Sequence, residues 1–299
     1  MKIIRSFDSP TREAHGANAA IGFFDGVHIA HQKVIGKAVA YGPPSAAITF
    51  ANSPAEFVKK TREASQLMDL DSKISAIEAL GVDYLFVFDF NDEVMNMSAD
   101  EFILKAVAPF GIERLISGFN FRMGKAPQTD SAALEALCID LGIKCDIVGP
   151  VYEGSELVSS SLIRQCLASG DIQKANKLLS RRFCYSGIIE HGRHMGRQLG
   201  FPTINIYIPP HLIVPKWGVY ESYTTISEGT YHSITNIGNR PTFGDGKFSV
   251  ETHILDYEGD LYGQSAKVEL AKMIRPEMKF GSVGELISQI ARDVESIRL

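Results

Sequence analysis

In the first half of the chain, short apolar runs alternate with segments whose apolar residues recur at helical spacing. The apolar runs predict strands at residues 19–23, 46–50, 84–88, 115–118 and 145–148. The helical spacing predicts helices between them, at residues 31–40, 72–80, 98–108 and 131–141. Because strands and helices alternate, we expect an α/β domain in which helices cover both faces of a parallel sheet.

Beyond residue 182 the pattern changes to short β runs separated by turns that contain Gly and Pro. These runs predict strands at residues 184–190, 204–208, 218–223, 231–236, 249–255 and 266–271. Strands at this spacing are typical of a closed antiparallel barrel. A final helix is predicted at residues 283–297, with Ser282 as its N-cap and Glu285 three residues later. We therefore predict two domains, residues 1–182 and residues 183–299, the second a β-barrel with a terminal helix.

The composition fits this division and argues against several classes of protein. A chain of 299 residues is long enough for two domains. Its net charge of −5 comes without a basic block, so no nucleic-acid partner is expected. No apolar run approaches the ~20 residues that span a bilayer, so no membrane partner is expected either. The four cysteines show no C-x-x-C spacing, which indicates free thiols and a cytoplasmic location. We expect a monomer or a weak homo-oligomer.

The first candidate site lies at residues 19–32, where an apolar run leads through a Gly- and Asp-containing turn directly into a helical pattern. Such strand-turn-helix connections bind phosphates at the carboxyl ends of strands. His28 and His31 stand three residues apart, so both imidazoles are expected on one helix face, where they would stabilise a polyphosphate. A strand-loop-helix with two surface histidines fits the spacing equally well. The turn residues expected beside the phosphates are Gly22, Phe24, Asp25 and Gly26.

Two further segments of the first half follow predicted strands. Residues 49–54 are interpreted mainly as a strand exit into a turn. Residues 117–125 contain Asn120 and Phe121 and resemble a P-loop only superficially. Five residues separate Gly118 from Gly124, and Ala126 replaces the Ser or Thr that a P-loop requires.

Residues 158–164 form the last candidate segment of the first half. Ser160 and Ser161 stand at the start of an amphipathic helix, where one hydroxyl is expected to cap it. Capping does not explain Arg164, one turn further on. A guanidinium fork in that position suits a departing pyrophosphate.

The candidate chemistry of the second half begins at a glycine-rich loop. Gly192, Gly196 and Gly200 precede a predicted strand that starts near Thr203 and Asn205. Such a loop can wrap phosphates with its backbone N–H groups. Thr203 and Asn205 are two residues apart, so they point to one face and offer the oxygen ligands that Mg²⁺ prefers. A hairpin loop followed by two polar strand residues is the alternative.

These segments resemble motifs of the bacterial bifunctional riboflavin kinase/FMN adenylyltransferases, also called FAD synthetases. The motifs resembled in the first half are G-x-F-D-G-x-H-x-G-H at residues 22–31, G-x-(D/N)-F-x-F-G from residue 118 and I-S-S-T-x-I-R at 158–164. Those in the second half are G-R-x-L-G-F-P-T-x-N at 196–205, N-x-G-x-R-P-T-F at 236–243, E-x-H-x-x-D at 251–256 and R-x-E-x-x-F at 275–280. Ala30 departs from the first motif, which has Gly there.

The resemblance implies that the barrel phosphorylates riboflavin to FMN with ATP. It implies that Glu251 is the general base for the ribityl 5′-hydroxyl and that Mg²⁺ is bound by Thr203 and Asn205. The glycine loop would close over ATP. The residues implied to bind flavin in this domain are Asn236, Arg240 and Arg275.

For the first domain the resemblance implies a Rossmann-like nucleotidyltransferase that converts FMN and ATP to FAD and pyrophosphate. His28 and His31 would stabilise charge on the α-phosphoryl oxygens, and Asn120 would position the nucleotide. The residues implied to hold pyrophosphate are Ser160, Ser161 and Arg164. Phe121 would line the flavin pocket.

Two other functions stay open at this stage. Ala30, the replacement of a Pro and a His by Asn52 and Ser53, and the altered residues 126–130 allow a riboflavin kinase joined to a degenerate flavin-binding or regulatory first domain. A non-catalytic, flavin-responsive binding protein is the second alternative. The predicted base and metal ligands argue against it, because a pure binder needs neither.

Overall fold

The computed structural model of the chain describes residues 1–7, 14–54, 65–125, 129–192, 196, 199–238 and 248–298. Its contacts divide the chain into two compact units, Met1–Ser160 and Ser161–Leu299. Each unit is described by itself. No helix in these described ranges is long and apolar enough to cross a membrane.

A parallel sheet forms the centre of the first unit. Its strands are β1 (Lys2–Ile4), β2 (Asn18–Ile21), β3 (Ser45–Phe50), β4 (Tyr84–Phe88), β5 (Arg114–Gly118) and β8 (Lys144–Val148). They lie in the order β1-β4-β3-β2-β5-β8, and every neighbouring pair is parallel. The strands predicted from apolar runs are confirmed. The pattern misses β1, because three residues with one buried side chain carry no periodicity.

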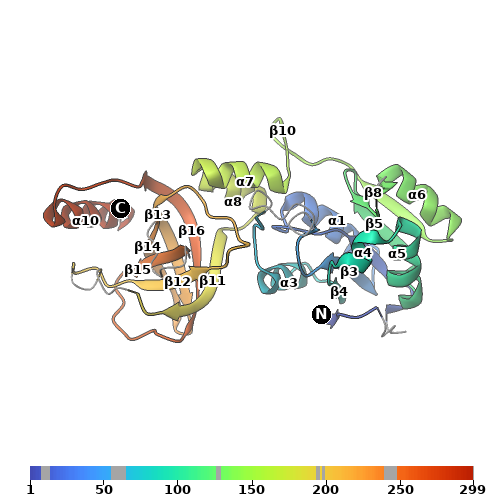
Figure 1. Ribbon diagram of the computed structural model, residues 1–299, viewed down its shortest axis with the longest axis horizontal. Helices are drawn as coiled ribbons and strands as arrows, with labels where there is room; N and C mark the ends of the chain where they lie inside the picture. Colours follow the sequence, from blue (N-terminus) through green and yellow to red (C-terminus); the bar gives the residue numbers. More distant parts are fainter. Residues whose placement is uncertain are drawn as a thin grey trace. The chain divides into compact units, whose positions relative to one another are not determined.

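Helices cover both faces of this sheet, as predicted. They are α1 (Ile29–Ala40), α3 (Leu70–Glu78), α4 (Asp92–Asn96), α5 (Ala99–Ala106), the 3₁₀ turn η3 (Ala108–Phe110) and α6 (Ser131–Asp140). Helices α1 and α3 lie on one side, and α4, α5 and α6 on the other (Figure 1). Successive strand residues divide between two buried clusters: Ala46 and Phe86 face the α5 side, whereas Ala47 and Leu85 face the α1 side. The sheet is therefore buried on both faces.

Local sequence signals fix several helix ends. Ser98 and Glu101 form the predicted capping box at the start of α5. Gly81 and Gly142 follow α3 and α6 in the left-handed region, with φ of 82° and 70°, as expected for glycines that end helices. Helix α5 ends before the predicted residue 108, because Pro109 cannot continue the ladder of N–H donors.

The strand order creates a switch point beside β2. The chain runs outward from β2 through β3 to β4, and then returns to place β5 on the other side of β2. In open parallel sheets, ligands bind at the carboxyl ends of the strands that flank such a point. The turns after β2 and β5 are therefore the positions in the first unit that the topology selects for a ligand.

The second unit is a closed antiparallel barrel. Its strands are β11 (Phe183–Glu190), β12 (Ile204–Ile208), β13 (Gly218–Ile226), β14 (Gly229–Ile237), β15 (Phe248–Ile254) and β16 (Ser265–Pro276). They close in the order β11-β12-β15-β14-β13-β16, which confirms the predicted barrel. Inside it, fully buried hydroxyls bond to one another: Ser222 to Thr235 at 2.7 Å and Thr235 to Thr252 at 2.8 Å.

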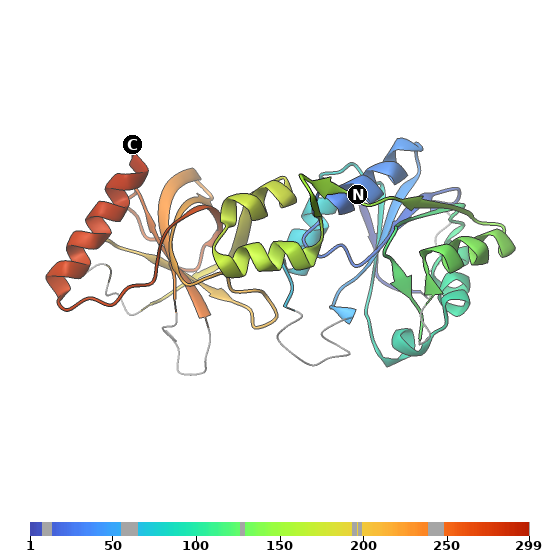
Figure 2. The same ribbon diagram turned by 90° about the horizontal axis from the view of Figure 1, so that it is seen from above.

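The predicted terminal helix is α10 (Val283–Arg298), which lies beside the barrel (Figure 2). The Ser282 hydroxyl accepts a hydrogen bond from the Glu285 N–H at 3.2 Å, so the predicted N-cap is present. Near its other end, Arg298 pairs with Asp256 in the loop after β15 at 2.6 Å. Smaller elements complete the chain: the hairpins β6 (Arg122–Met123) with β7 (Thr129–Asp130) and β9 (Tyr152–Glu153) with β10 (Glu156–Leu157), and the helices α7 (Ser160–Ser169) and α8 (Ile172–Leu179).

The contact boundary at Ser160 differs from the predicted domain boundary at 182/183, because α8 packs on the barrel. The Asn176 side chain accepts from the Phe183 N–H at 2.7 Å and donates to the Leu270 carbonyl at 2.8 Å. Helix α8 also carries a stripe of buried apolar side chains, which includes Ile172 and Leu178. The sequence pattern shows where helices give way to strands, but it does not show that a helix packs on the barrel. The domain boundary at 182/183 therefore stays a prediction.

We expect a fragment of residues 161–299 to unfold at a higher temperature than a fragment of residues 183–299. Removal of α8 exposes its apolar stripe, at a cost of roughly 1.5–3 kcal/mol for each large side chain, and leaves the Phe183 N–H and the Leu270 carbonyl without Asn176. Thermal unfolding followed by circular dichroism measures the difference. Asn176→Ala in the longer fragment isolates the hydrogen bonds, and equal melting temperatures of the two fragments would favour the boundary at 182/183.

Candidate active sites

The turn after β2 has an unusual backbone. Phe24, Gly26 and Val27 all have positive φ, at 54°, 83° and 38°. For Phe24 and Val27 this left-handed region costs about 1–3 kcal/mol each, so surrounding contacts must hold them. The side chain of Phe24 also explains Gly22, where a Cβ atom would lie 2.8 Å from the Phe24 ring. Gly22 and Gly26 thus allow the turn to form, whatever they bind.

Groups from three other segments hold this turn. The Thr49 hydroxyl donates to the Phe23 carbonyl at 2.9 Å, and the Leu67 N–H donates to Asp25 Oδ1 at 2.8 Å. The Ser160 hydroxyl donates to the Asp25 carbonyl at 2.9 Å. The Asp25 side chain is buried, so its oxygen supports the loop before α3 rather than facing solvent.

His28 and His31 lie together at the start of α1, as their spacing predicts. Their rings stack with centroids 3.6 Å apart and an interplanar angle of 17°. His28 is itself the N-cap of α1, because its Nδ1 accepts the His31 N–H at 3.3 Å. This bond leaves the proton of a neutral His28 on Nε2. Phe24 packs edge-on against His31, with centroids 5.4 Å apart, so the turn positions the second ring directly.

The turn after β5 lies beside the same switch point. Asn120 is exposed there, as a residue that binds a ligand would be. Phe121, predicted to line a flavin pocket, packs against the core on the α5 side of the sheet and remains partly exposed, so its contact with flavin stays a prediction. The Asn52 side chain forms structural hydrogen bonds: it donates to the Phe90 carbonyl at 2.7 Å and accepts from the Phe90 N–H at 2.8 Å. The interpretation of residues 49–54 as a strand exit agrees with this bridge.

Ser160, Ser161 and Arg164 all lie on α7, in its first turn or immediately after it. Ser160 belongs to the first unit and contacts the turn after β2 through Asp25. Ser161 and Arg164 belong to the second unit. Ser160 and Arg164 are four residues apart, so they share one face of α7.

The outer face of the barrel carries a cavity of ≈ 220 Å³. The predicted residues Gly196, Thr203, Asn205, Asn236, Glu251 and Arg275 all line it. Its other walls are apolar or aromatic side chains and further charged groups: Leu199, Phe201, Val219, Ile234, His253, Glu277, Met278, Phe280, Leu286, Ile290 and Asp293. Helix α10 supplies Leu286, Ile290 and Asp293 to this list.

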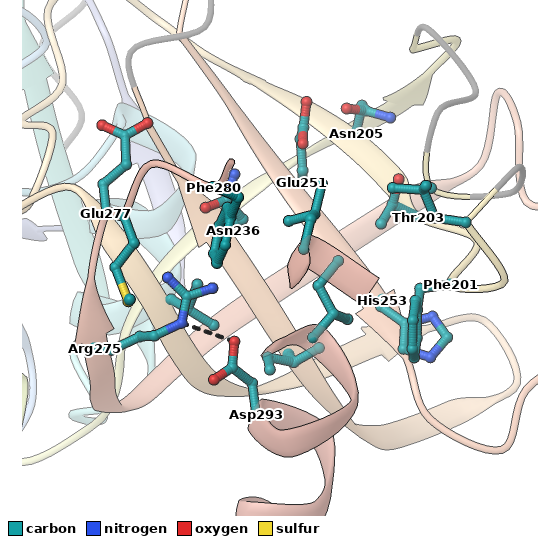
Figure 3. Close-up of a pocket in the computed structure, with 17 residues that line it drawn as sticks. Phe201, Thr203, Asn205, Asn236, Glu251, His253, Arg275, Glu277, Phe280 and Asp293 are labelled. Carbon is teal, nitrogen blue, oxygen red and sulfur yellow. Dashed lines mark hydrogen bonds and ion pairs between the residues drawn. The ribbon is translucent and has the colours of Figure 1, made fainter. Parts of the chain in front are cut away.

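Strand register brings the polar residues of this cavity together. Glu251 on β15 lies opposite Asn205 on β12 and opposite Asn236 on β14. Residues directly opposite on paired strands point to one face, so the three side chains form a row across the sheet. Figure 3 shows Glu251 between Asn236 and Asn205 in this row. In the same register, Asn236 lies opposite Val219, which lies opposite Arg275 on β16.

A second cavity of ≈ 480 Å³ shares two residues with the first. Thr203 and Asn205 line both cavities and so form the wall between them. The glycine loop approaches this wall closely: a Cβ atom on Gly192 would lie 2.4 Å from Asn205 Nδ2, and one on Gly196 would lie 3.1 Å from Thr203 Oγ1. Gly200 has φ of 86°. Gly192 and Gly196 therefore let the backbone pack against the two predicted metal ligands.

Arg275 is held by a residue that the sequence does not single out. Its Nε donates to Asp293 Oδ2 at 2.8 Å (Figure 3). Gln289 donates to the other Asp293 oxygen at 2.8 Å. Asp293 is 3% exposed. A buried acid on an amphipathic helix looks like any other polar position in the sequence, so only the structure identifies it. Glu277 belongs to a quoted motif, and its position in the cavity wall could have been inferred from that motif.

Arg240, predicted to bind flavin, lies outside the described residues, as do residues 126–128 of the loop before β7.

Comparison with known proteins gives matches to both units. The family model for FAD synthetase matches residues 11–162, and that for riboflavin kinase matches residues 179–299. The bifunctional riboflavin kinase/FMN adenylyltransferase of Bacillus subtilis (strain 168) is 36% identical over 290 residues, which cover 93% of this chain and 91% of the relative. The enzyme of that name from Escherichia coli (strain K12) is 32% identical over 300 residues, with 98% and 96% covered.

A crystal structure described as a macrolide-efflux protein from Streptococcus pneumoniae is similar over both units. Its TM-score is 0.86 at 25% identity, and the match covers 100% of this chain and 99% of that one. The family models together span both units, and the relatives match along nearly their whole length. The chain therefore belongs to the family of bifunctional riboflavin kinase/FMN adenylyltransferases.

Proposed function

We propose that the barrel phosphorylates riboflavin and that the α/β unit adenylylates the FMN produced. The observation that carries the kinase half is the row of Asn205, Glu251 and Asn236 in the first cavity, with Asn205 also lining the second. The first cavity, with its aromatic and apolar lining, suits riboflavin. ATP would bind on the other side of Thr203 and Asn205, which also line the second cavity. The two substrates would then meet at Thr203 and Asn205.

In the kinase step, Glu251 accepts the proton of the ribityl 5′-hydroxyl. The 5′-oxygen forms a bond to the γ-phosphorus, while the bond from that phosphorus to the β–γ bridging oxygen breaks and ADP leaves. Asn205 and Asn236 flank Glu251 on the neighbouring strands. Asp293 holds Arg275, which we propose contacts the flavin, in one orientation.

Mg²⁺ fits the donors at the wall between the cavities. No group of three or more His, Cys, Asp and Glu side chains in the described ranges could hold a metal ion. Thr203 and Asn205 supply neutral oxygens there, and Mg²⁺ is commonly bound by few protein oxygens together with substrate phosphates and water. When bound, the ion would neutralise charge on the ATP phosphates.

In the adenylyl step, a phosphate oxygen of FMN forms a bond to the α-phosphorus of ATP. The bond from that phosphorus to the α–β bridging oxygen breaks, and pyrophosphate leaves. The nucleophile is already anionic, so no base is required. His28 Nε2 and His31, at the positive end of α1, stabilise the α-phosphoryl oxygens. Asn120 contacts the nucleotide, and Ser160, Ser161 and Arg164 receive the leaving group.

The setting and the partners are part of the same proposal. We propose a cytoplasmic enzyme that acts on small molecules, without a nucleic-acid or membrane partner, as a monomer or weak homo-oligomer. The free thiols of Cys138, Cys145, Cys166 and Cys184 are compatible with a reducing compartment.

Glu251→Gln should lower riboflavin phosphorylation by roughly 10²–10⁴-fold, because the amide cannot accept the hydroxyl proton. Conversion of added FMN to FAD should remain at the wild-type rate. Chromatographic time courses started from riboflavin and from FMN measure both steps. Glu269→Gln, at a partly buried barrel carboxylate that lines neither cavity, is the matched control. Loss of both steps in Glu251→Gln would contradict two separate sites.

His31→Ala should have the opposite selectivity. We expect FMN adenylylation to fall by about 10²–10³-fold through loss of charge stabilisation at the α-phosphorus, with riboflavin phosphorylation unchanged. The same time courses report it, and His211→Ala is a control at an exposed histidine. Wild-type FAD formation by His31→Ala would show that the histidine pair is only structural.

Thr203→Val should raise the Mg²⁺ concentration for half-maximal riboflavin phosphorylation by at least ~10-fold, because it removes a ligand oxygen at little change in shape. A Mg²⁺ titration of the initial rate measures this, and FMN adenylylation by the same sample is the internal control. An unchanged Mg²⁺ requirement would remove Thr203 from the metal site.

A further inference from the structure

The side chain of Lys73, on α3, is completely buried beneath the turn after β2. Its relative exposure is 0%, and its Nζ donates to the carbonyl of Phe50, the last residue of β3, at 3.0 Å. The same Nζ lies 3.8 Å from the centroid of the Phe23 ring. This distance is within the range of a cation–π interaction. One ammonium group therefore connects α3 to the exits of two neighbouring strands.

The position of this charge relates it to the proposed adenylyl site. Phe23 immediately precedes the strained residues of the turn, and His31 packs on Phe24. Hydrogen bonds already hold the turn at the Phe23 carbonyl, at Asp25 Oδ1 and at the Asp25 carbonyl. Lys73 contacts the turn at a further point, the face of the Phe23 ring.

Burying the ammonium group is costly, and the pKa shows it. Burial lowers the pKa of Lys73 from 10.5 to about 8, while the nearby Asp25 carboxylate opposes the shift. Among the described residues, Asp25 is the charged group that acts on Lys73. The other contacts of its Nζ are the Phe50 carbonyl and the Phe23 ring. The amine is thus mainly charged at pH 7 and mainly neutral above pH 9. A neutral amine can still donate to Phe50, but loses its attraction to the ring and to Asp25.

We propose that Lys73 is a positioning residue for adenylyl transfer, whose buried ammonium group holds the Phe23–Asp25 turn that presents His28 and His31. It acts through Phe23 and Asp25 and is not assigned a contact with substrate. This role rests on the adenylyl site proposed above.

The effect of Lys73 on stability changes with pH in the opposite direction to its expected effect on activity. Between pH 8 and pH 10.5 the unfolded chain binds more protons at Lys73 than the folded chain, so this residue's contribution to the free energy of unfolding rises with pH. Stability and adenylyl transfer are therefore expected to change in opposite directions. A fall in activity above pH 8 cannot arise from unfolding driven by Lys73.

The experiment compares both reactions of the full chain between pH 7 and pH 9.5. For the wild type we expect kcat/KM for FMN adenylylation to fall by ~10-fold through a midpoint near pH 8, the scale of losing one cation–π contact. Riboflavin phosphorylation in the same samples should lack this alkaline decrease. Lys73→Met should give low adenylylation at every pH, and Lys73→Arg, which stays charged, should retain activity without the decrease.

Thermal unfolding of each variant checks that the α/β unit is intact. An adenylylation profile of the wild type that is flat over this range would overturn the proposal without any variant. An alkaline decrease that persists in Lys73→Met would overturn it as well. Failure of the adenylyl site itself is recognised separately, by wild-type FAD formation in His31→Ala at pH 7.

Discussion

The register between β12, β15 and β14 is the constraint on which the kinase site depends. Side chains alternate between the two faces of a strand, so a slip of one residue would turn Glu251 inward and bring Thr252 to the outer face. The inner face opposes such a slip. Thr252 bonds to Thr235 there at 2.8 Å, and both hydroxyls are fully buried. A slip would leave buried hydroxyls unpaired, at about 1–3 kcal/mol for each.

The two sites obtain their geometry by different means. In the barrel, paired strands fix the row of polar side chains, and α10 adds Asp293 from one side. In the α/β unit, the turn that leads to His28 and His31 follows the carboxyl end of β2 and is not part of a strand ladder. The positive φ values of Phe24 and Val27 must be maintained by contacts from outside the turn. The second site therefore depends on supporting residues several segments away in the sequence.

This difference decides how much the sequence could predict. Periodicity locates the main strands and helices, and the spacing of His28 and His31 predicts that their rings lie on one face, where they stack. It does not reveal that His28 caps α1, because capping by an imidazole has no common sequence signature. Periodicity and spacing also do not reveal the structural roles of Lys73 and Asp293. Each is a charged residue on an amphipathic helix, and only the tertiary contacts show that it is buried.

The departures from the family motifs can be judged in the same terms. Ala30 lies inside α1 and is not among the residues with positive φ, so its backbone does not require glycine. Asn52 replaces a motif residue but bonds with both polar atoms to the backbone of Phe90, which ties the exits of β3 and β4 together. These substitutions change how the strand exits and the helix start are supported, while the stacked histidines and the hydroxyl of Ser160 remain at the turn. The hydrogen bonds described above that hold the turn of the proposed adenylyl site come from Thr49, Leu67 and Ser160, not from Ala30 or Asn52.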